Sequence, residues 1–161
     1  MANNANHCPG GLTLRSLWWL AVLALVSGCS GTATRGDLSG ARQEVVMNAL
    51  AQVGTPYRFG GTSPAGFDCS GLVQYTHLAA GVRVPRTTKA QKKASQRVRG
   101  SRRQPGDLLF FRIGFNRYHV GILVDDERFV HAPSSGKRVQ LSRIDNPYWE
   151  RRLRSTATFL N

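Results

Sequence analysis

One cysteine is the residue of this sequence best suited to nucleophilic chemistry. Cys69 follows a glycine-rich loop and precedes apolar residues at helical spacing, with Asp68 before it as a favourable N-cap. The sequence therefore places Cys69 at the first position of a helix that ends before Gly81. Unpaired backbone N–H groups and the positive end of the helix dipole favour thiolate over thiol at such a position. We expect Cys69 to be a reactive nucleophile.

Two histidines are candidates to serve this thiol. His119 begins one expected strand and His131 ends the next, and in an up-and-down hairpin these positions lie at the same edge of the sheet. If that edge faces the start of the Cys69 helix, His119 can take the thiol proton and His131 can fix the tautomer of His119. His77 lies eight residues into the helix, and we interpret it as structural.

The first 28 residues predict an export signal rather than part of the fold. Arg15 supplies a short basic region, and residues 17–26 form an apolar run that is too short for a comfortable membrane span. Val26-Ser27-Gly28-Cys29 resembles the lipobox of bacterial lipoproteins, which implies lipidation of Cys29. Ser30 after it implies sorting to the outer membrane. Cleavage without lipidation is the alternative, and either way we expect a periplasmic protein.

Cysteine usage supports a reactive role for Cys69. Cys8 leaves with the signal and Cys29 is consumed by lipid, so Cys69 remains as an unpartnered thiol in an oxidising compartment. Such a thiol is either reactive or forms an intermolecular bridge, and a buried inert cysteine is the third possibility.

The charge balance is strongly basic. The chain has 161 residues with 22 Lys and Arg against 9 Asp and Glu, a net charge of +13. Behind an export signal this favours anionic lipid, lipopolysaccharide phosphates or acidic cell-wall peptides as partners over nucleic acid. Residues 83–103 contain nine basic residues and no acidic one. We expect this basic segment to contact anionic wall or lipid groups.

The expected elements change character half-way along the chain. A small polar tether at residues 29–40 leads into a domain over 41–161, which begins with a helix through residue 53. The Cys69 helix follows, then a short helix capped by Thr87 or Thr88, and residues 114–118 form a loop. Strands are expected at residues 108–111, 119–124, 128–131, 138–141 and 153–160, with a short helix after Asn146-Pro147. This order predicts an α+β fold in which N-terminal helices pack on a C-terminal antiparallel sheet of about five or six strands.

These residues also carry a family resemblance that spans about residues 42–155. The sequence resembles the NlpC family of papain-like cell-wall cysteine peptidases, and within it the small murein endopeptidase lipoproteins of the Spr type. The motifs are Thr55-Pro56-Tyr57-Arg58-Phe59-Gly60-Gly61, Gly66-Phe67-Asp68-Cys69-Ser70-Gly71-Leu72-Val73, Pro85-Arg86-Thr87-Thr88, Gly106-Asp107-Leu108, His119-Val120-Gly121-Ile122, Phe129-Val130-His131-Ala132 and Asn146-Pro147-Tyr148-Trp149.

The resemblance implies a papain-like fold and a site in which Cys69 is the nucleophile, His119 the base and His131 the third polar residue. It also implies that Tyr57 lies beside the thiol, and that Asp68 and Ser70 line the substrate cleft. The implied reaction is hydrolysis of amide bonds in peptidoglycan stem peptides through an acyl-enzyme. We expect a monomer without a cofactor or metal.

Several alternatives stay open. The cleaved bond is the D-alanyl–diaminopimelate cross-link or, as the alternative, the γ-D-glutamyl–diaminopimelate bond. A domain that binds stem peptides without cutting them is a different class of function, although it would have little reason to keep all three polar residues. Zinc held by Cys69, His119 and His131 would need three ligands whose spacing matches no local zinc motif. Acyl transfer to an acceptor other than water is a further possibility.

Overall fold

The structure, a computed structural model, describes residues 36–134 and 137–160. The expected signal peptide, Cys29 and the first part of the tether lie outside these residues. Residues Thr34–Asn161 form one compact unit, and the fold below is that of this unit. In the described residues, no helix has the length and apolar character to cross a membrane.

Helices occupy the first half of the unit and strands most of the second. The helices are α2 (Gly36–Ala51), α3 (Cys69–Ala79), α4 (Thr88–Ala94) and α5 (Pro147–Glu150), with a 3-10 turn η2 (Gly100–Arg102). The strands are β1 (Thr62–Ser63), β2 (Gly66–Phe67), β3 (Gln96–Val98), β4 (Leu108–Gly114), β5 (Arg117–Leu123), β6 (Arg128–His131), β7 (Gln140–Arg143) and β8 (Leu153–Thr158). Strands β1 and β2 form a small hairpin, and the other six form one sheet of order β3-β8-β4-β5-β6-β7.

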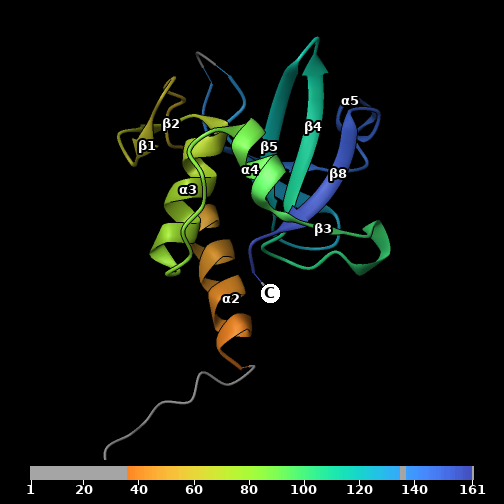
Figure 1. Ribbon diagram of the computed structural model, residues 1–161. Coiled ribbons are helices and arrows are strands. Elements are labelled where there is room, and N and C mark those ends of the chain that lie inside the picture. The colour runs from red at the N-terminus through yellow and green to blue at the C-terminus, as the bar shows by residue number, and fades with distance from the viewer. Residues whose placement is uncertain (1–35, 135–136, 161) are drawn as a thin grey trace, which may run out of the picture. The chain divides into compact units, whose positions relative to one another are not determined.

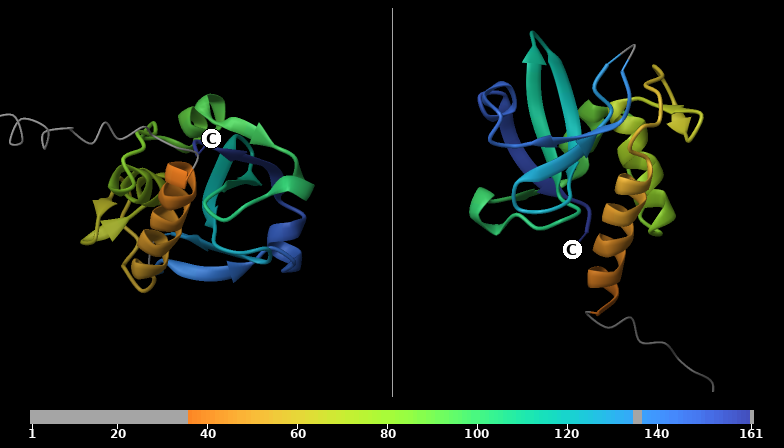
Figure 2. Two further views of the ribbon diagram at one scale, coloured as in Figure 1. Left: turned by 90° about the horizontal axis from the view of Figure 1, so that it is seen from below. Right: turned by 180° about the vertical axis from the view of Figure 1, so that it is seen from behind.

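The sheet is antiparallel throughout and has α2 and α3 side by side against one face (Figures 1 and 2). This arrangement confirms the α+β class and the six-strand sheet. The described residues also confirm the Asn146 cap of α5 and the Thr87 cap of α4.

Both faces of the central strands are buried. Leu108 and Phe110 of β4 join Leu72 and Val73 of α3 in a core between helices and sheet. Residues that alternate with them, such as Phe111, belong to a smaller core on the opposite face. A strand that is covered on both sides needs apolar residues at every position. This explains the continuous apolar run at residues 108–111.

Three local expectations were wrong, and one strand was not expected. Helix α2 begins at Gly36, so residues 36–40, expected in the flexible tether, are helical. The loop expected at residues 114–118 is shorter, because strands β4 and β5 extend until only residues 115 and 116 separate them. Asn116 takes a positive φ of 50° in this tight turn. Strand β3 was not expected, because its polar sequence carries no strand pattern. Strand β7 is displaced to Gln140–Arg143 from the expected 138–141.

Candidate active site

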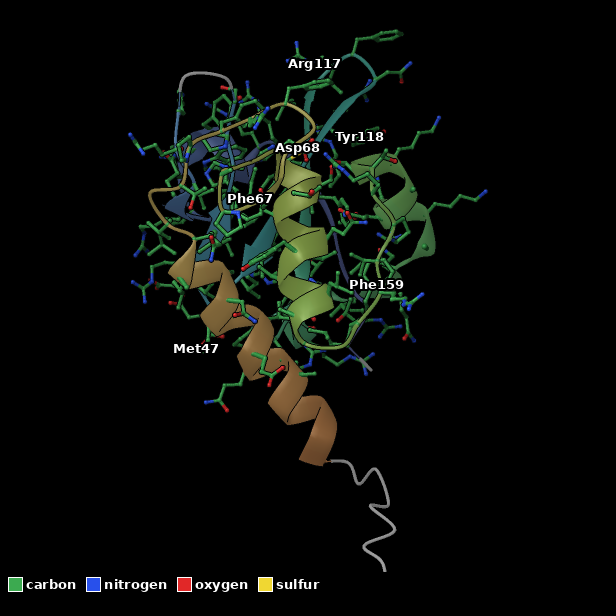
Figure 3. The ribbon with its side chains drawn as sticks, turned by 90° about the vertical axis from the view of Figure 1, so that its left-hand side faces the viewer. Met47, Phe67, Asp68, Arg117, Tyr118 and Phe159 are labelled. Atoms are coloured by element: carbon green, nitrogen blue, oxygen red, sulfur yellow. The ribbon has the colours of Figure 1, made fainter. Side chains whose placement is uncertain are left out.

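The start of α3 is fixed by the side chain of Asp68. Its Oδ1 accepts a hydrogen bond from the N–H of Gly71 at 2.7 Å and from Ser70 Oγ at 3.2 Å, and its Oδ2 accepts from the N–H of Gly60 at 3.0 Å. This is the expected N-cap, and it places Cys69 at the first residue of the helix. Figure 3 shows Asp68 at the end of α3 nearest to Arg117 and Tyr118 of β5.

Arg86 completes the environment of this carboxylate. Its guanidinium forms an ion pair with Asp68 and also donates to Ser70 Oγ at 3.0 Å. Burial alone would raise the pKa of Asp68, but the hydrogen bonds from Arg86 and from the N–H groups of Gly71 and Gly60 outweigh it and hold the pKa below its usual value. Asp68 is therefore an anion at neutral pH, held by the residues around it.

Glycine is required where the loop before α3 packs on the helix. A Cβ added at Gly71 would lie 1.9 Å from the carbonyl oxygen of Gly61, and one added at Gly61 would lie 2.2 Å from that of Gly66. Since no side chain fits between these backbone segments, the glycines let the loop close against the first turn of α3. The same packing holds Cys69 at the surface of the cleft.

The thiol of Cys69 is half-buried between α3, α4 and β5. Its Sγ lies 3.5 Å from Thr88 Oγ1. Burial raises the pKa of the Cys69 thiol, and hydrogen bonds from Thr88 and from the N–H groups of Val120 and Ser70 offset this only in part. This direction runs against the expectation of a thiolate at the helix start, because burial of the sulfur favours the neutral thiol.

His119 and His131 form the pair that the hairpin argument predicted. The Nε2 of His119 lies 2.9 Å from the Nδ1 of His131, and both side chains are buried. Burial lowers the pKa of His119 to about 4. It lowers the pKa of His131 to about 3, with smaller contributions from His119 and Lys137. At neutral pH the Cys69 thiol and both imidazoles are therefore neutral.

Ser142 extends this pair into a chain of hydrogen bonds. The Nε2 of His131 lies 2.9 Å from Ser142 Oγ. If His131 donates its Nε2–H to that oxygen, its Nδ1 carries a lone pair and accepts the Nε2–H of His119. The Nδ1 of His119 then carries a lone pair and is free to act as a base.

Trp149 covers the two imidazoles. Its indole stacks on His119 with ring centroids 5.4 Å apart and an interplanar angle of 24°, and it meets His131 edge-on at 4.8 Å. Neither Trp149 nor Ser142 was identified from the sequence as a site residue. Trp149 stood inside a recognised motif, but nothing in the pattern linked it to the histidines.

A cleft of about 830 Å³ brings these groups together. Its lining includes Tyr57, Asp68, Cys69, Ser70 and His119. His131 does not line it but lies behind His119. Burial, with smaller contributions from Cys69 and Asp68, raises the pKa of Tyr57, so its phenol keeps its proton.

The third histidine of the described residues, His77, is a core residue, as expected. His77 is fully buried in α3, its Nδ1 lies 2.9 Å from the carbonyl oxygen of Val73, and its ring meets Phe159 edge-on. Among the described residues, no group of three or more His, Cys, Asp and Glu side chains is arranged to hold a metal ion.

The cleft architecture agrees with the family comparison. The NlpC/P60 family model matches residues 54–158, which include Cys69, His119 and His131. The chain belongs to the NlpC/P60 family.

Curated NlpC/P60 relatives include proteins named as endopeptidases. The chain is 46% identical over 101 residues to a probable endopeptidase of Haemophilus influenzae, covering 61% of this chain and 62% of that protein. It is 41% identical over 100 residues to the murein DD-endopeptidase MepS/murein LD-carboxypeptidase of Escherichia coli, covering 62% of this chain and 53% of that protein. The chain thus spans less than two thirds of the length of these relatives.

Solved NlpC/P60 structures share the fold. A Staphylococcus aureus protein similar to a lipoprotein of the NLP/P60 family superposes with a TM-score of 0.69 at 32% identity, covering 88% of this chain and 48% of that one. An NlpC/P60 family protein of Bacillus cereus superposes with a TM-score of 0.70 at 26% identity, covering 74% and 40% of the two chains. The papain-like fold expected from the sequence is confirmed.

Proposed function

We propose that this protein is a peptidoglycan endopeptidase that hydrolyses amide bonds of the stem peptides, with Cys69 as nucleophile. The observation that carries the proposal is that a thiol at a helix start and His119 line one cleft, with His131 hydrogen-bonded to His119 behind it. The named endopeptidase activities of its NlpC/P60 relatives support the same reaction class.

The first half-reaction forms a thioester. As Sγ attacks the carbonyl carbon of the scissile amide, the Nδ1 of His119 takes the thiol proton, because thiol and imidazole are both neutral at rest. The N–H of Cys69 and the phenol of Tyr57 are the donors that would hold the oxyanion. The imidazolium of His119 then protonates the leaving amine, and the C–N bond breaks.

The second half-reaction restores the enzyme. His119, neutral again, takes a proton from a water molecule as the water oxygen attacks the thioester carbonyl, and the thiolate leaves with the proton returned by His119. His131 and Ser142 would keep His119 in the tautomer whose Nδ1 faces the cleft. Trp149 would shield this chain of hydrogen bonds from water.

The charge of the cleft fits an acidic peptide. Arg86, Lys89 and Arg117 line it together with the single carboxylate of Asp68. Asp68 is already paired with Arg86. The side chains of Lys89 and Arg117 therefore remain to attract the carboxylates that stem peptides carry. Asp68 and Ser70 would form the wall against which the substrate lies.

For the cleaved bond we propose the D-alanyl–diaminopimelate cross-link, with the γ-D-glutamyl–diaminopimelate bond as the alternative. The names of MepS and of a second Escherichia coli relative, murein DD-endopeptidase MepH, which is 34% identical over 131 residues, support the cross-link. For location we propose the periplasm, with lipid on Cys29 as an outer-membrane anchor. The mass of the processed N-terminus would test the anchor.

Digestion of purified sacculi tests the function and the bond together. Cleavage of cross-links should convert dimeric fragments into monomers, which mass spectrometry of the released fragments would detect. Shortened monomer stems would instead indicate the γ-D-glutamyl bond. The Cys69→Ser variant is the matched control and should release nothing. Sacculi that bind the wild-type protein but stay intact would contradict the proposal and favour a binding module.

A further inference from the structure

The basic segment 83–103 does not form one surface in the folded protein. Arg86 is committed to the ion pair with Asp68, and the ammonium of Lys92 lies 4.3 Å from the ring centre of Tyr118. Arg97 and Arg99, in contrast, lie on β3 and directly after it, at the edge of the sheet. The segment expected to act as a unit is thus divided between the cleft side and this edge.

At the edge, Arg97 and Arg99 meet arginines from a distant part of the sequence. Strand β3 pairs with β8, and Figure 1 shows the two strands adjacent at one side of the sheet. A groove of about 730 Å³ between them is lined by Arg97, Arg99 and Arg154. Arg154 also lines a neighbouring hollow. The lining of that hollow includes three other arginines, Arg112, Arg151 and Arg152, and the apolar residue Ile113. We call Arg97, Arg99, Arg112, Arg151 and Arg154 the arginine groove.

These five side chains have no acidic partners in the described part of the chain. The ion pairs found there use Arg42, Arg86, Arg128 and Arg143. All five groove residues are exposed, so their guanidinium groups can reach a ligand. Arg152 differs, because it stacks on the ring of Tyr148 at 3.8 Å and donates to its carbonyl oxygen. Like charges gathered around these two adjoining hollows repel each other unless an anion lies between them.

We propose that the arginine groove binds the phosphate groups of anionic membrane lipids. Planar guanidinium groups bind phosphate oxygens through paired hydrogen bonds, and a phosphate offers more acceptor oxygens than a carboxylate to several arginines at once. The export signal and lipobox expected at residues 1–29 favour a membrane over nucleic acid as the source of phosphate. The groove between β3 and β8 shares no lining residue with the Cys69 cleft, and the neighbouring hollow shares only Ile113 with it, so lipid at the arginines would leave Cys69 open to substrate.

Binding of residues 34–161 to lipid vesicles tests this site. This compact unit contains the described fold and lacks the apolar leader, which would itself insert into lipid. Vesicles with about one quarter phosphatidylglycerol should bind it, and pure phosphatidylcholine vesicles should not. The variant Arg97→Gln/Arg154→Gln should bind roughly 25-fold more weakly, since each basic residue at an anionic membrane contributes roughly fivefold. Added salt should weaken binding of the wild type.

The matched control is Arg58→Gln/Arg83→Gln, which removes the same charge from two exposed arginines away from the groove. It should retain most of the wild-type binding. Equal losses in the two variants would mean that net charge alone acts and would overturn the site. Tighter binding to a short single-stranded DNA than to the vesicles would overturn the choice of ligand. Neither result depends on peptidase activity, so these experiments test the lipid site independently of the proposed reaction.

Discussion

Among single residues, the sequence predicted which side chains meet at the cleft but not their resting protonation state. Cys69, His119 and His131 could be predicted because their residue types are few and each stands at the end of an expected element. Ser142 could not, because its contact with His131 depends on the register in which β6 pairs with β7, where His131 lies opposite Gln140. The direction of the thiol pKa could not be predicted either, because burial of the sulfur comes from α4 and β5.

The resting thiol gives a prediction about reactivity and pH. Because burial raises the pKa of Cys69, alkylation of residues 34–161 by iodoacetamide should rise with pH around a midpoint above the ordinary value of about 8.5. The same chain unfolded in urea is the control and should show a midpoint near that ordinary value. Intact mass at several pH values measures both. Labelling that is as fast well below neutral pH as at high pH would show a preformed thiolate. This result would contradict a resting site with a neutral thiol and a neutral imidazole.

At the scale of elements, one buried ion pair ties α2 to the sheet. The guanidinium of Arg42 donates to Asp107 Oδ1 at 2.8 Å and to the carbonyl oxygen of Leu160 at 2.7 Å, and the side chain of Asp107 is almost completely buried. The helical period of α2 predicted its core face, including Val45. The partner of Arg42 could not be predicted, since it lies 65 residues away and depends on how helix and sheet pack.

Removal of the Arg42 side chain should therefore destabilise the fold much more than removal of an arginine from a surface ion pair. The variant Arg42→Gln leaves Asp107 buried without its cation and should lower the free energy of unfolding by about 3 kcal/mol, as measured by urea denaturation. Arg143→Gln is the matched control, because Arg143 pairs with Glu127 and Asp145 at the exposed surface. This variant should change stability little. Similar losses in the two variants would show that the Arg42 pair does not stabilise the packing of α2.

At the scale of the whole molecule, the fold separates two kinds of surface. The cleft between α3 and β5 holds the thiol, His119 and cations suited to an acidic peptide, while the arginine groove runs from the β3–β8 edge to Arg112 of β4. The sequence predicted the α+β class because apolar periodicity changes from helical to strand-like along the chain. It could not predict the groove, because β3 shows no strand pattern and its arginines meet those of β8 only through the pairing of these strands.

Trapping the covalent intermediate tests directly whether Cys69 is the nucleophile. Wild-type protein mixed with a purified cross-linked muropeptide dimer and quenched in acid should carry the acyl half of the dimer in place of the thiol hydrogen. Peptide mapping by mass spectrometry should locate this adduct on Cys69, and Cys69→Ala should neither form it nor cleave the dimer. Cleavage of the dimer by Cys69→Ala at the wild-type rate, or an adduct on another residue, would contradict the account.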